Sequence, residues 1–117
     1  MAIKDLADEF VALLKSNKSE EAAARYNADD IVSYEAADGP MAVCRGKDEV
    51  KKKGDWWYEN HEFHGGDVAG PYVNGDQFAV RFSFDVTNRQ SGERIKMDEV
   101  GIYTVRDGKI VEERFFY

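Results

Sequence analysis

Carboxylates are the side chains of this sequence that are best suited to move a proton, and one of them ends a distinctive segment. The segment ADDIVSYE, residues 28–35, begins with two acids, passes through a short apolar stretch and ends on Glu35. A carboxylate in an apolar pocket can act as a general base, whereas the same group in water is a solvated surface charge. The chain has 23 Asp and Glu residues, so the local sequence leaves both interpretations of Glu35 open.

The two histidines suggest a metal site as an alternative chemistry. His61 and His64, with Glu62 and Asp67 nearby, are residue types that bind zinc. An H-x-x-H spacing at the start of a strand, however, directs the two imidazoles to opposite faces. We therefore expect no metal site, and a surface or loop position for both histidines.

Cys44 is the single cysteine of the chain. Neither histidine stands at a spacing that would make it the base of a thiol nucleophile, so we expect Cys44 to be a small buried hydrophobe. A lone cysteine cannot form an intramolecular disulfide, which favours a reducing compartment. We therefore expect a cytoplasmic location.

The first part of the chain predicts two helices. Ile3, Leu6, Phe10 and Leu13 recur every three to four residues, which is typical of an amphipathic helix over residues 3–16. Ser19, followed by two glutamates, has the pattern of an N-cap with acids in the first helical turn. A second, short helix is therefore predicted to continue through AAARY.

A hairpin and a third helix follow. Residues 31–35 and 41–44 are separated by the turn sequence DGP and predict two short strands. Residues 48–58 have helix-forming composition. Of the adjacent tryptophans, which diverge by roughly 100° on a helix, we expect Trp57 to form a pocket wall, although plain core packing is an alternative. The same side of the helix carries Val50, Lys53 and Gly54.

From residue 62 onward the pattern changes to strands. Asn74-Gly75, the loop NRQSGE and Asp107-Gly108 mark three turns. They divide the rest of the chain into a four-stranded antiparallel meander, approximately 63–73, 77–87, 94–106 and 109–117. In the second of these strands, one face is continuously apolar and therefore belongs to the core: Phe78, Val80, Phe82, Phe84 and Val86.

The opposite face of the meander suggests a partner. In the third strand, Val100 and Ile102 alternate with Met97 and Tyr103, so both faces carry apolar residues. Helices can cover one face, and a second subunit could cover the other. Together with the aromatic end Phe115, Phe116 and Tyr117, this pattern predicts a homodimer that pairs through the sheet.

Three stretches of the chain resemble a known superfamily. They are FVALLKSNKSEEAAARYNADDIVSYE, RGKDEV and the closing VRDGKIVEERFFY. They are similar to SnoaL-like and ketosteroid-isomerase-like members of the NTF2-like superfamily. The resemblance covers nearly the whole chain and implies one α+β domain over residues 1–117. Its expected architecture is an NTF2-like cone, with three helices packed on a curved, mainly antiparallel sheet around an apolar pocket.

The resemblance also gives Glu35 a role. Ketosteroid isomerases carry a strand A-D-D-x-x-x-x-D whose last residue is the general base, and Glu35 holds that position in ADDIVSYE. The same enzymes need a tyrosine and a protonated aspartate as oxyanion donors. Phe10 and Gly101 stand at those two positions, and losing one such donor costs about 10²–10³ in rate. The chain is therefore not expected to be a ketosteroid isomerase proper.

Glu99 is the acid nearest to the Gly101 position, where SnoaL-like cyclases also carry an acid. Glu99 lies on the same face of the predicted strand as Met97 and Tyr103, so it is expected to reach the same cavity. An outward or dimer-facing position remains an alternative. Glu35 as base and Glu99 as acid are thus the expected catalytic pair. The residues expected to contact the ligand are Phe10, Tyr34, Trp57, Gly101 and Tyr103.

Composition restricts the partners. The net charge of −7 repels nucleic acid and anionic lipid, and no apolar run approaches the roughly 20 residues of a membrane helix. We expect neither partner and no cofactor. Two functions remain. The first is a pocket enzyme performing isomerase, cyclase or dehydratase chemistry on an apolar carbonyl compound. The second is a non-catalytic ligand-binding or dimerisation module, in which Glu35 would be exposed or salt-bridged and the cavity wholly apolar.

Overall fold

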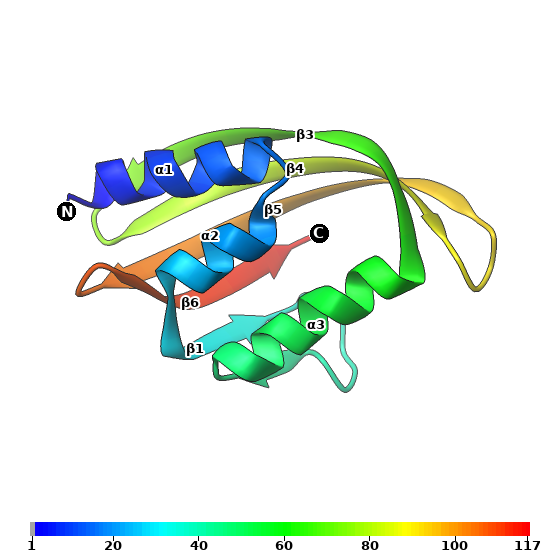
Figure 1. Ribbon diagram of the computed structural model, residues 1–117, viewed down its shortest axis with the longest axis horizontal. Helices are drawn as coiled ribbons and strands as arrows, with labels where there is room; N and C mark the ends of the chain where they lie inside the picture. Colours follow the sequence, from blue (N-terminus) through cyan, green and yellow to red (C-terminus); the bar gives the residue numbers. More distant parts are fainter. Residues whose placement is uncertain (1) are drawn as a thin grey trace.

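The computed structural model describes residues 2–117, which form three helices and one six-stranded sheet (Figure 1). The predicted α+β fold, with three helices on a mainly antiparallel sheet, is confirmed. In chain order the elements are α1 (Ile3–Lys15), α2 (Ser19–Tyr26), β1 (Asn27–Tyr34), β2 (Val43–Arg45), α3 (Lys47–Asn60), β3 (His61–Asn74), β4 (Gln77–Asn88), β5 (Arg94–Arg106) and β6 (Lys109–Phe116).

The helices follow the predicted pattern, with one correction. The apolar stripe of α1 enters the core, where Leu6 and Phe10 are buried. The expectation that Ser19 caps α2 is wrong, because Lys18 is the N-cap and Ser19 is the first helical residue. The Ser19 hydroxyl instead lies 3.2 Å from the Tyr58 hydroxyl of α3. It therefore links two helices rather than ending one.

The tight turns of the meander lie where the sequence predicted them. Gly75 has φ 61°, and Asp107 and Gly108 have φ 53° and 75°. Positive φ at both central residues is the geometry of a two-residue hairpin, which Asp-Gly adopts readily. The β3–β4 and β5–β6 hairpins are thus set by their local sequence.

The sheet order is β2-β1-β6-β5-β4-β3. Its one parallel pair joins β1 to β6 and aligns Ser33 with Glu113 and Tyr34 with Arg114. This pairing was not predicted, because the two strands are separated by most of the chain. It places the segment that contains Glu35 beside the C-terminal strand.

All three helices lie on one side of the curved sheet (Figure 1). Helix α1 packs against β3 and β4 at one edge, whereas α3 packs against β1 and β2 at the other edge and against β3, the strand that follows it. The central strands β5 and β6 therefore face the space between the helices. This arrangement creates the cavity.

The two faces of the sheet differ in their side chains. On the inner face of β4, Phe78, Val80 and Phe82 stand beside Tyr103, Gly101 and Glu99 of β5. The outer face carries intramolecular polar contacts in exposed positions. They are Arg81 to Asp98 at 3.4 Å, Ser83 to Asp98 at 2.8 Å and the bidentate contact of Arg94 with Asp85 at 2.9 and 3.0 Å.

Candidate active site

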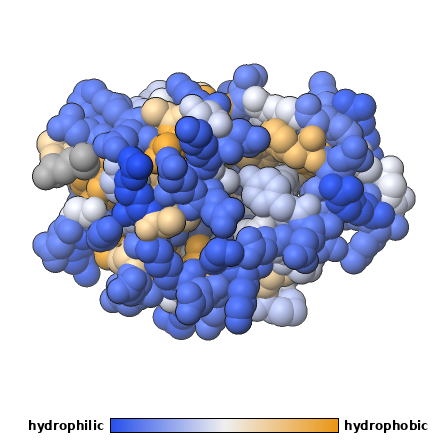
Figure 2. All heavy atoms as spheres, in the orientation of Figure 1, coloured by the Kyte–Doolittle hydropathy of each residue, from blue (hydrophilic) through white to orange (hydrophobic). Residues whose placement is uncertain are grey.

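A cavity of about 1600 Å³ lies between the helices and the inner face of the sheet. Phe10 of α1 and Trp57 of α3 form opposite walls, and Phe82, Phe84 and Phe115 cover the sheet. Figure 2 shows hydrophobic atoms in the hollow between the end of α1 and α3, above the long strands, while most of the surrounding surface is hydrophilic. The cavity suits a largely apolar molecule.

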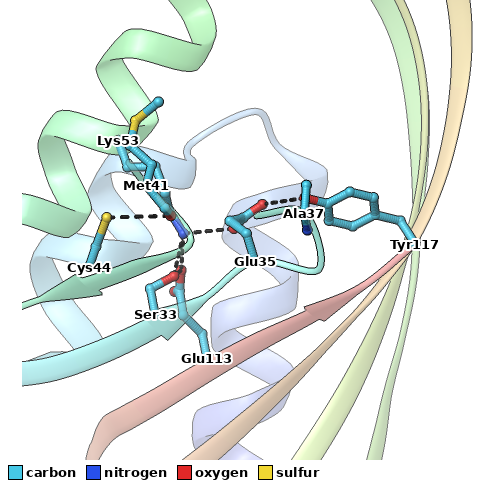
Figure 3. Close-up of polar contacts among 8 residues, drawn as sticks. All are labelled: Ser33, Glu35, Ala37, Met41, Cys44, Lys53, Glu113 and Tyr117. Atoms are coloured by element: carbon cyan, nitrogen blue, oxygen red, sulfur yellow. Dashed lines mark hydrogen bonds and ion pairs between the residues drawn. The ribbon is translucent and has the colours of Figure 1, made fainter. Parts of the chain in front are cut away.

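One wall of the cavity carries a group of connected polar side chains, which we call the lysine cluster: Ser33, Glu35, Lys53, Glu113 and Tyr117. Lys53 extends from α3, and its Nζ donates hydrogen bonds to Glu35 Oε2 at 2.7 Å and to Ser33 Oγ. The Ser33 hydroxyl in turn donates to Glu113 Oε2 at 2.8 Å. Figure 3 shows these contacts converging on the lysine nitrogen.

Both oxygens of Glu35 have partners. Lys53 holds Oε2, and the Tyr117 hydroxyl donates to Oε1 at 3.2 Å (Figure 3). The Tyr117 oxygen itself accepts the backbone N–H of Ala37 at 3.3 Å. Glu35 is therefore a fixed, ion-paired carboxylate, as the non-catalytic interpretation expects.

The lysine cluster is poorly accessible to water. The side chains of Lys53, Glu35 and Glu113 are 13%, 25% and 11% exposed. Burial raises the pKa of Glu113 above its ordinary value, while Lys53 and the Ser33 hydrogen bond act in the opposite direction. Lys53 Nζ lies 4.0 Å from Glu113 Oε2, so one cation compensates two carboxyl groups.

Glu99 has a different environment on β5, the strand that neighbours β6. It lines the cavity from β5 and has no ion pair within residues 2–117. Its pKa is raised from 4.5 to about 7, first by burial and then by the negative charge of Glu35, while Lys53 acts in the opposite direction. Near neutral pH the carboxyl group is thus populated in both protonation states. The cavity is not wholly apolar, contrary to the non-catalytic interpretation.

A family model described as the SnoaL-like domain matches residues 1–117. The chain belongs to the SnoaL-like family. A crystal structure from Mesorhizobium loti, provisionally named a SnoaL-like polyketide cyclase, is 62% identical, with complete coverage of both chains and a TM-score of 0.98. No curated protein matches the sequence.

Two more distant structures share the fold. An NTF2-like protein from Burkholderia thailandensis is 19% identical, with a TM-score of 0.83 and coverage of 99% of this chain and 90% of that chain. A protein from Catenulispora acidiphila with a ketosteroid isomerase-like fold is 14% identical, with a TM-score of 0.74 and coverage of 95% and 86%. The SnoaL-like chain thus has the NTF2-like fold that its sequence predicted. No helix within residues 2–117 is long and apolar enough to cross a membrane.

Three of the five expected ligand contacts of the SnoaL-like chain line the cavity: Phe10, Trp57 and Tyr103. Tyr34 does not, because Ser33 and Glu35 point inward and alternation turns Tyr34 outward, where the Arg114 guanidinium lies 4.0 Å from its ring centre. Gly101 is buried on the inner face but has no side chain to offer the cavity.

The end of α3 corrects the expectation for one histidine. His61 lines the cavity, and its ring stacks on Trp57 with 4.6 Å between centroids, so a surface or loop position is wrong for it. Its Nδ1 donates to the Trp57 carbonyl at 2.9 Å. His64 lies at an exposed position, 2.7 Å from the Thr87 hydroxyl. Within residues 2–117 no His, Cys, Asp and Glu group is arranged to hold a metal ion.

Four cluster residues of the SnoaL-like chain were absent from the predicted site: Ser33, Lys53, Glu113 and Tyr117. The helix pattern did place Lys53 on the same side as Trp57, which is a signal for an inward lysine. In β6, Glu113 lies on the same face as Phe115, which is a weaker signal for an inward carboxylate. Their convergence depends on the β1–β6 pairing, which has no local signature.

Proposed function

We propose that this SnoaL-like chain binds an apolar, carbonyl-bearing small molecule and catalyses cofactor-free acid–base chemistry on it, of the isomerase, cyclase or dehydratase type. The observation that carries the proposal is Glu99, an unpaired carboxyl group in an aromatic cavity with a pKa of about 7. An acid or base with a pKa near the working pH is the most effective at proton transfer. The name of the Mesorhizobium loti relative agrees with a carbonyl-rich substrate.

In the proposed mechanism, Glu35 is the base and Glu99 is the acid. Lys53 and Tyr117 orient Glu35. The Glu35 carboxylate accepts a proton from the carbon next to the substrate carbonyl, and protonated Glu99 gives its proton to the carbonyl oxygen, so that an enol forms. The enol then returns a proton to Glu99 and receives one from Glu35 at carbon, which regenerates both groups. Steroid isomerisation is not proposed, since Phe10 and Gly101 lack the donor groups.

Non-catalytic ligand binding is the second candidate. It is favoured by the double engagement of Glu35, whose oxygens are bonded to Lys53 and to Tyr117. In this case the lysine cluster would serve to hold the wall of the binding cavity in place.

Hydrogen–deuterium exchange separates the two candidates without knowledge of the product. A panel of cyclic ketones and 1,3-diketones is incubated with the protein in D₂O, and NMR follows exchange at the carbon next to the carbonyl. Glu99→Gln and Glu35→Gln should each slow the protein-dependent exchange by about 10²–10⁴. Glu59→Gln, an exposed position on α3, is the matched control. Exchange that is unaffected by both cavity substitutions would exclude the catalytic assignment.

We also propose that the chain forms a homodimer through the outer face of the sheet. Phe116 of β6 and Tyr72 of β3 are 53% and 63% exposed, and Phe116 lies beside Val100 of β5. Association of two such faces would remove these apolar atoms from water. Sedimentation velocity at micromolar concentration should show a dimer, and Phe116→Asp should shift it toward monomer. A monomeric wild-type chain would contradict the proposal.

Two further expectations from the sequence are retained as proposals. The whole span of residues 1–117 is proposed to act as one domain, and the single cysteine supports a cytoplasmic location. Cys44 is buried, and burial raises its pKa, so its thiol is poorly suited to act as a nucleophile.

A further inference from the structure

Among the described residues the Tyr103 hydroxyl has no protein partner and is not one of the buried unpaired polar atoms, so its oxygen is open to the cavity. Tyr103 is 3% exposed and lines the cavity from β5. Within residues 2–117 its oxygen forms no hydrogen bond, and burial raises the pKa of the phenol well above its ordinary value. At any working pH this hydroxyl is neutral and can donate a hydrogen bond.

Gly101 explains the position of this hydroxyl. Gly101 and Tyr103 lie on the same face of β5, and a Cβ atom at position 101 would meet Tyr103 Cε2 at 3.0 Å and the Tyr103 hydroxyl oxygen at 3.1 Å. The tyrosine ring therefore leans along the strand into the space that a side chain at position 101 would occupy. The missing side chain allows the hydroxyl to lie on the side of Glu99, the preceding inward residue.

Aromatic contacts hold the Tyr103 ring in this position. It stacks on Phe78 with 5.0 Å between centroids, tilts against Phe10 at 5.1 Å and meets Phe115 edge-on at 6.2 Å. A ring fixed on three sides loses little conformational freedom when its hydroxyl finds a partner. The donor is therefore preorganised before a ligand enters.

From this geometry we infer that the Tyr103 hydroxyl is the hydrogen-bond donor that binds the carbonyl oxygen of the ligand, in the space left open by Gly101. The inference rests on the proposed function for the class of ligand, and it adds the atom that recognises the oxygen. Phe10 and Gly101 withhold the two donors of related isomerases, and Tyr103 supplies one from a different position. The ligand oxygen then lies between Tyr103 and Glu99, the proposed acid.

Binding of 1-tetralone, an apolar bicyclic ketone, tests the inference, and tetralin is the same ring system without oxygen. Affinities are measured through the fluorescence of Trp57 and Trp56 at the cavity. Tyr103→Phe should weaken 1-tetralone binding by about tenfold or more, because the ketone oxygen is left unpaired, and should leave tetralin binding unchanged. Tyr34→Phe, whose ring lies outside the cavity against Arg114, is the matched control.

The carbonyl stretching frequency gives a readout that a purely structural tyrosine would not change. In complex with the wild-type protein, ¹³C-labelled 1-tetralone should absorb at lower frequency than in complex with Tyr103→Phe, since hydrogen bonding weakens the C=O bond. Gly101→Ala should also weaken 1-tetralone binding. This variant keeps Tyr103, but the added methyl group displaces the Tyr103 hydroxyl from its position. Circular dichroism verifies that both variants are folded.

The outcomes separate this inference from the proposed function. Equal 1-tetralone affinity and equal carbonyl frequency in wild type and Tyr103→Phe would overturn the inference, even if Glu99→Gln abolished exchange. A Tyr103-dependent affinity and frequency would support it, even if Glu99→Gln left exchange unchanged and the catalytic assignment failed. If the wild type binds neither 1-tetralone nor tetralin, the inference and the apolar-ligand proposal are overturned together.

Discussion

The two walls of the cavity use polar groups in opposite ways. In the lysine cluster, on the wall formed by β1, α3 and β6, Lys53 and Ser33 connect Glu35 and Glu113 through hydrogen bonds. On the wall formed by β5, Glu99 and the Tyr103 hydroxyl have no such partner within residues 2–117. The polar groups of the lysine cluster are hydrogen-bonded to one another, whereas those on the β5 wall can still form hydrogen bonds to a ligand.

The paired polar groups contribute to the stability of the fold, and the unpaired ones are available for ligand recognition. Buried polar groups that are paired with one another hold the cavity open at little net cost, whereas unpaired ones destabilise the free protein. The unpaired groups are then available to a ligand that brings the missing partner. Substitutions on the two walls should therefore change the free energy of unfolding in opposite directions.

The largest effect is expected at Lys53. Within residues 2–117, Lys53 is the one basic group bonded to Glu35. Lys53→Met removes it and leaves Glu113 buried without its neighbouring cation, so the free energy of unfolding at pH 7 should fall by about 3 kcal/mol or more. Urea unfolding measures the change. Lys52→Met, at an exposed position on the same helix, should change it by less than about 0.5 kcal/mol. An equal, small loss in both variants would show that the lysine cluster does not stabilise the fold.

The pH dependence of stability should expose the unpaired wall. The pKa of Glu99 is raised from 4.5 to about 7, so between these values the folded state binds more protons than the unfolded state. The contribution of Glu99 is fully present below pH 4.5 and is lost as the pH rises through about 7. At 1.36 kcal/mol per pKa unit, the loss is at most about 3 kcal/mol.

Urea unfolding at pH 5 and pH 8.5 measures this slope. Glu99→Gln should lose less stability over the interval than the wild type, while the buried Glu113, whose pKa is also raised, maintains a residual slope of the same sign. Glu59→Gln should reproduce the wild-type profile. An unchanged slope in Glu99→Gln would place its carboxyl group in contact with water.

The smallest effect compares one hydroxyl on each wall. Ser33 is fully buried and bridges Lys53 and Glu113, so Ser33→Ala should lower the free energy of unfolding by about 1–2 kcal/mol. Tyr103→Phe should leave it unchanged or raise it, since it removes a hydroxyl without a partner. Ser83→Ala on the exposed outer face is the control for Ser33→Ala. A loss in Tyr103→Phe as large as in Ser33→Ala would remove the contrast between the walls.

The fold was predictable because its signals are local. The apolar spacing of residues 3–16, the turns at Gly75 and Asp107-Gly108, and the alternation in β4 each determine one element within a few residues. Element boundaries differ by a few residues, as at β1, which begins at Asn27 rather than at residue 31.

The candidate site was predictable only in part. The position of Glu99 on the same strand face as Met97 and Tyr103 indicated an inward side chain, and all three residues line the cavity in the structure. The partners of Glu35 could not be inferred, because Lys53 reaches it from α3 and Tyr117 from the residue that follows β6. The position of the Tyr103 hydroxyl could not be predicted either, because it depends on the space over Gly101, which only the structure shows.

The parallel pairing of β1 with β6 has a consequence for folding kinetics. The hydrogen bond from Ser33 to Glu113 closes a separation of 80 residues along the chain, and contacts of such separation form late because the loop-closure entropy must be overcome first. The hairpins can fold early on their own turns, whereas the lysine cluster can form only when the sheet is complete. Protection of the backbone N–H groups that pair β1 with β6 around Ser33 and Glu113 should therefore be among the last signals to appear during refolding.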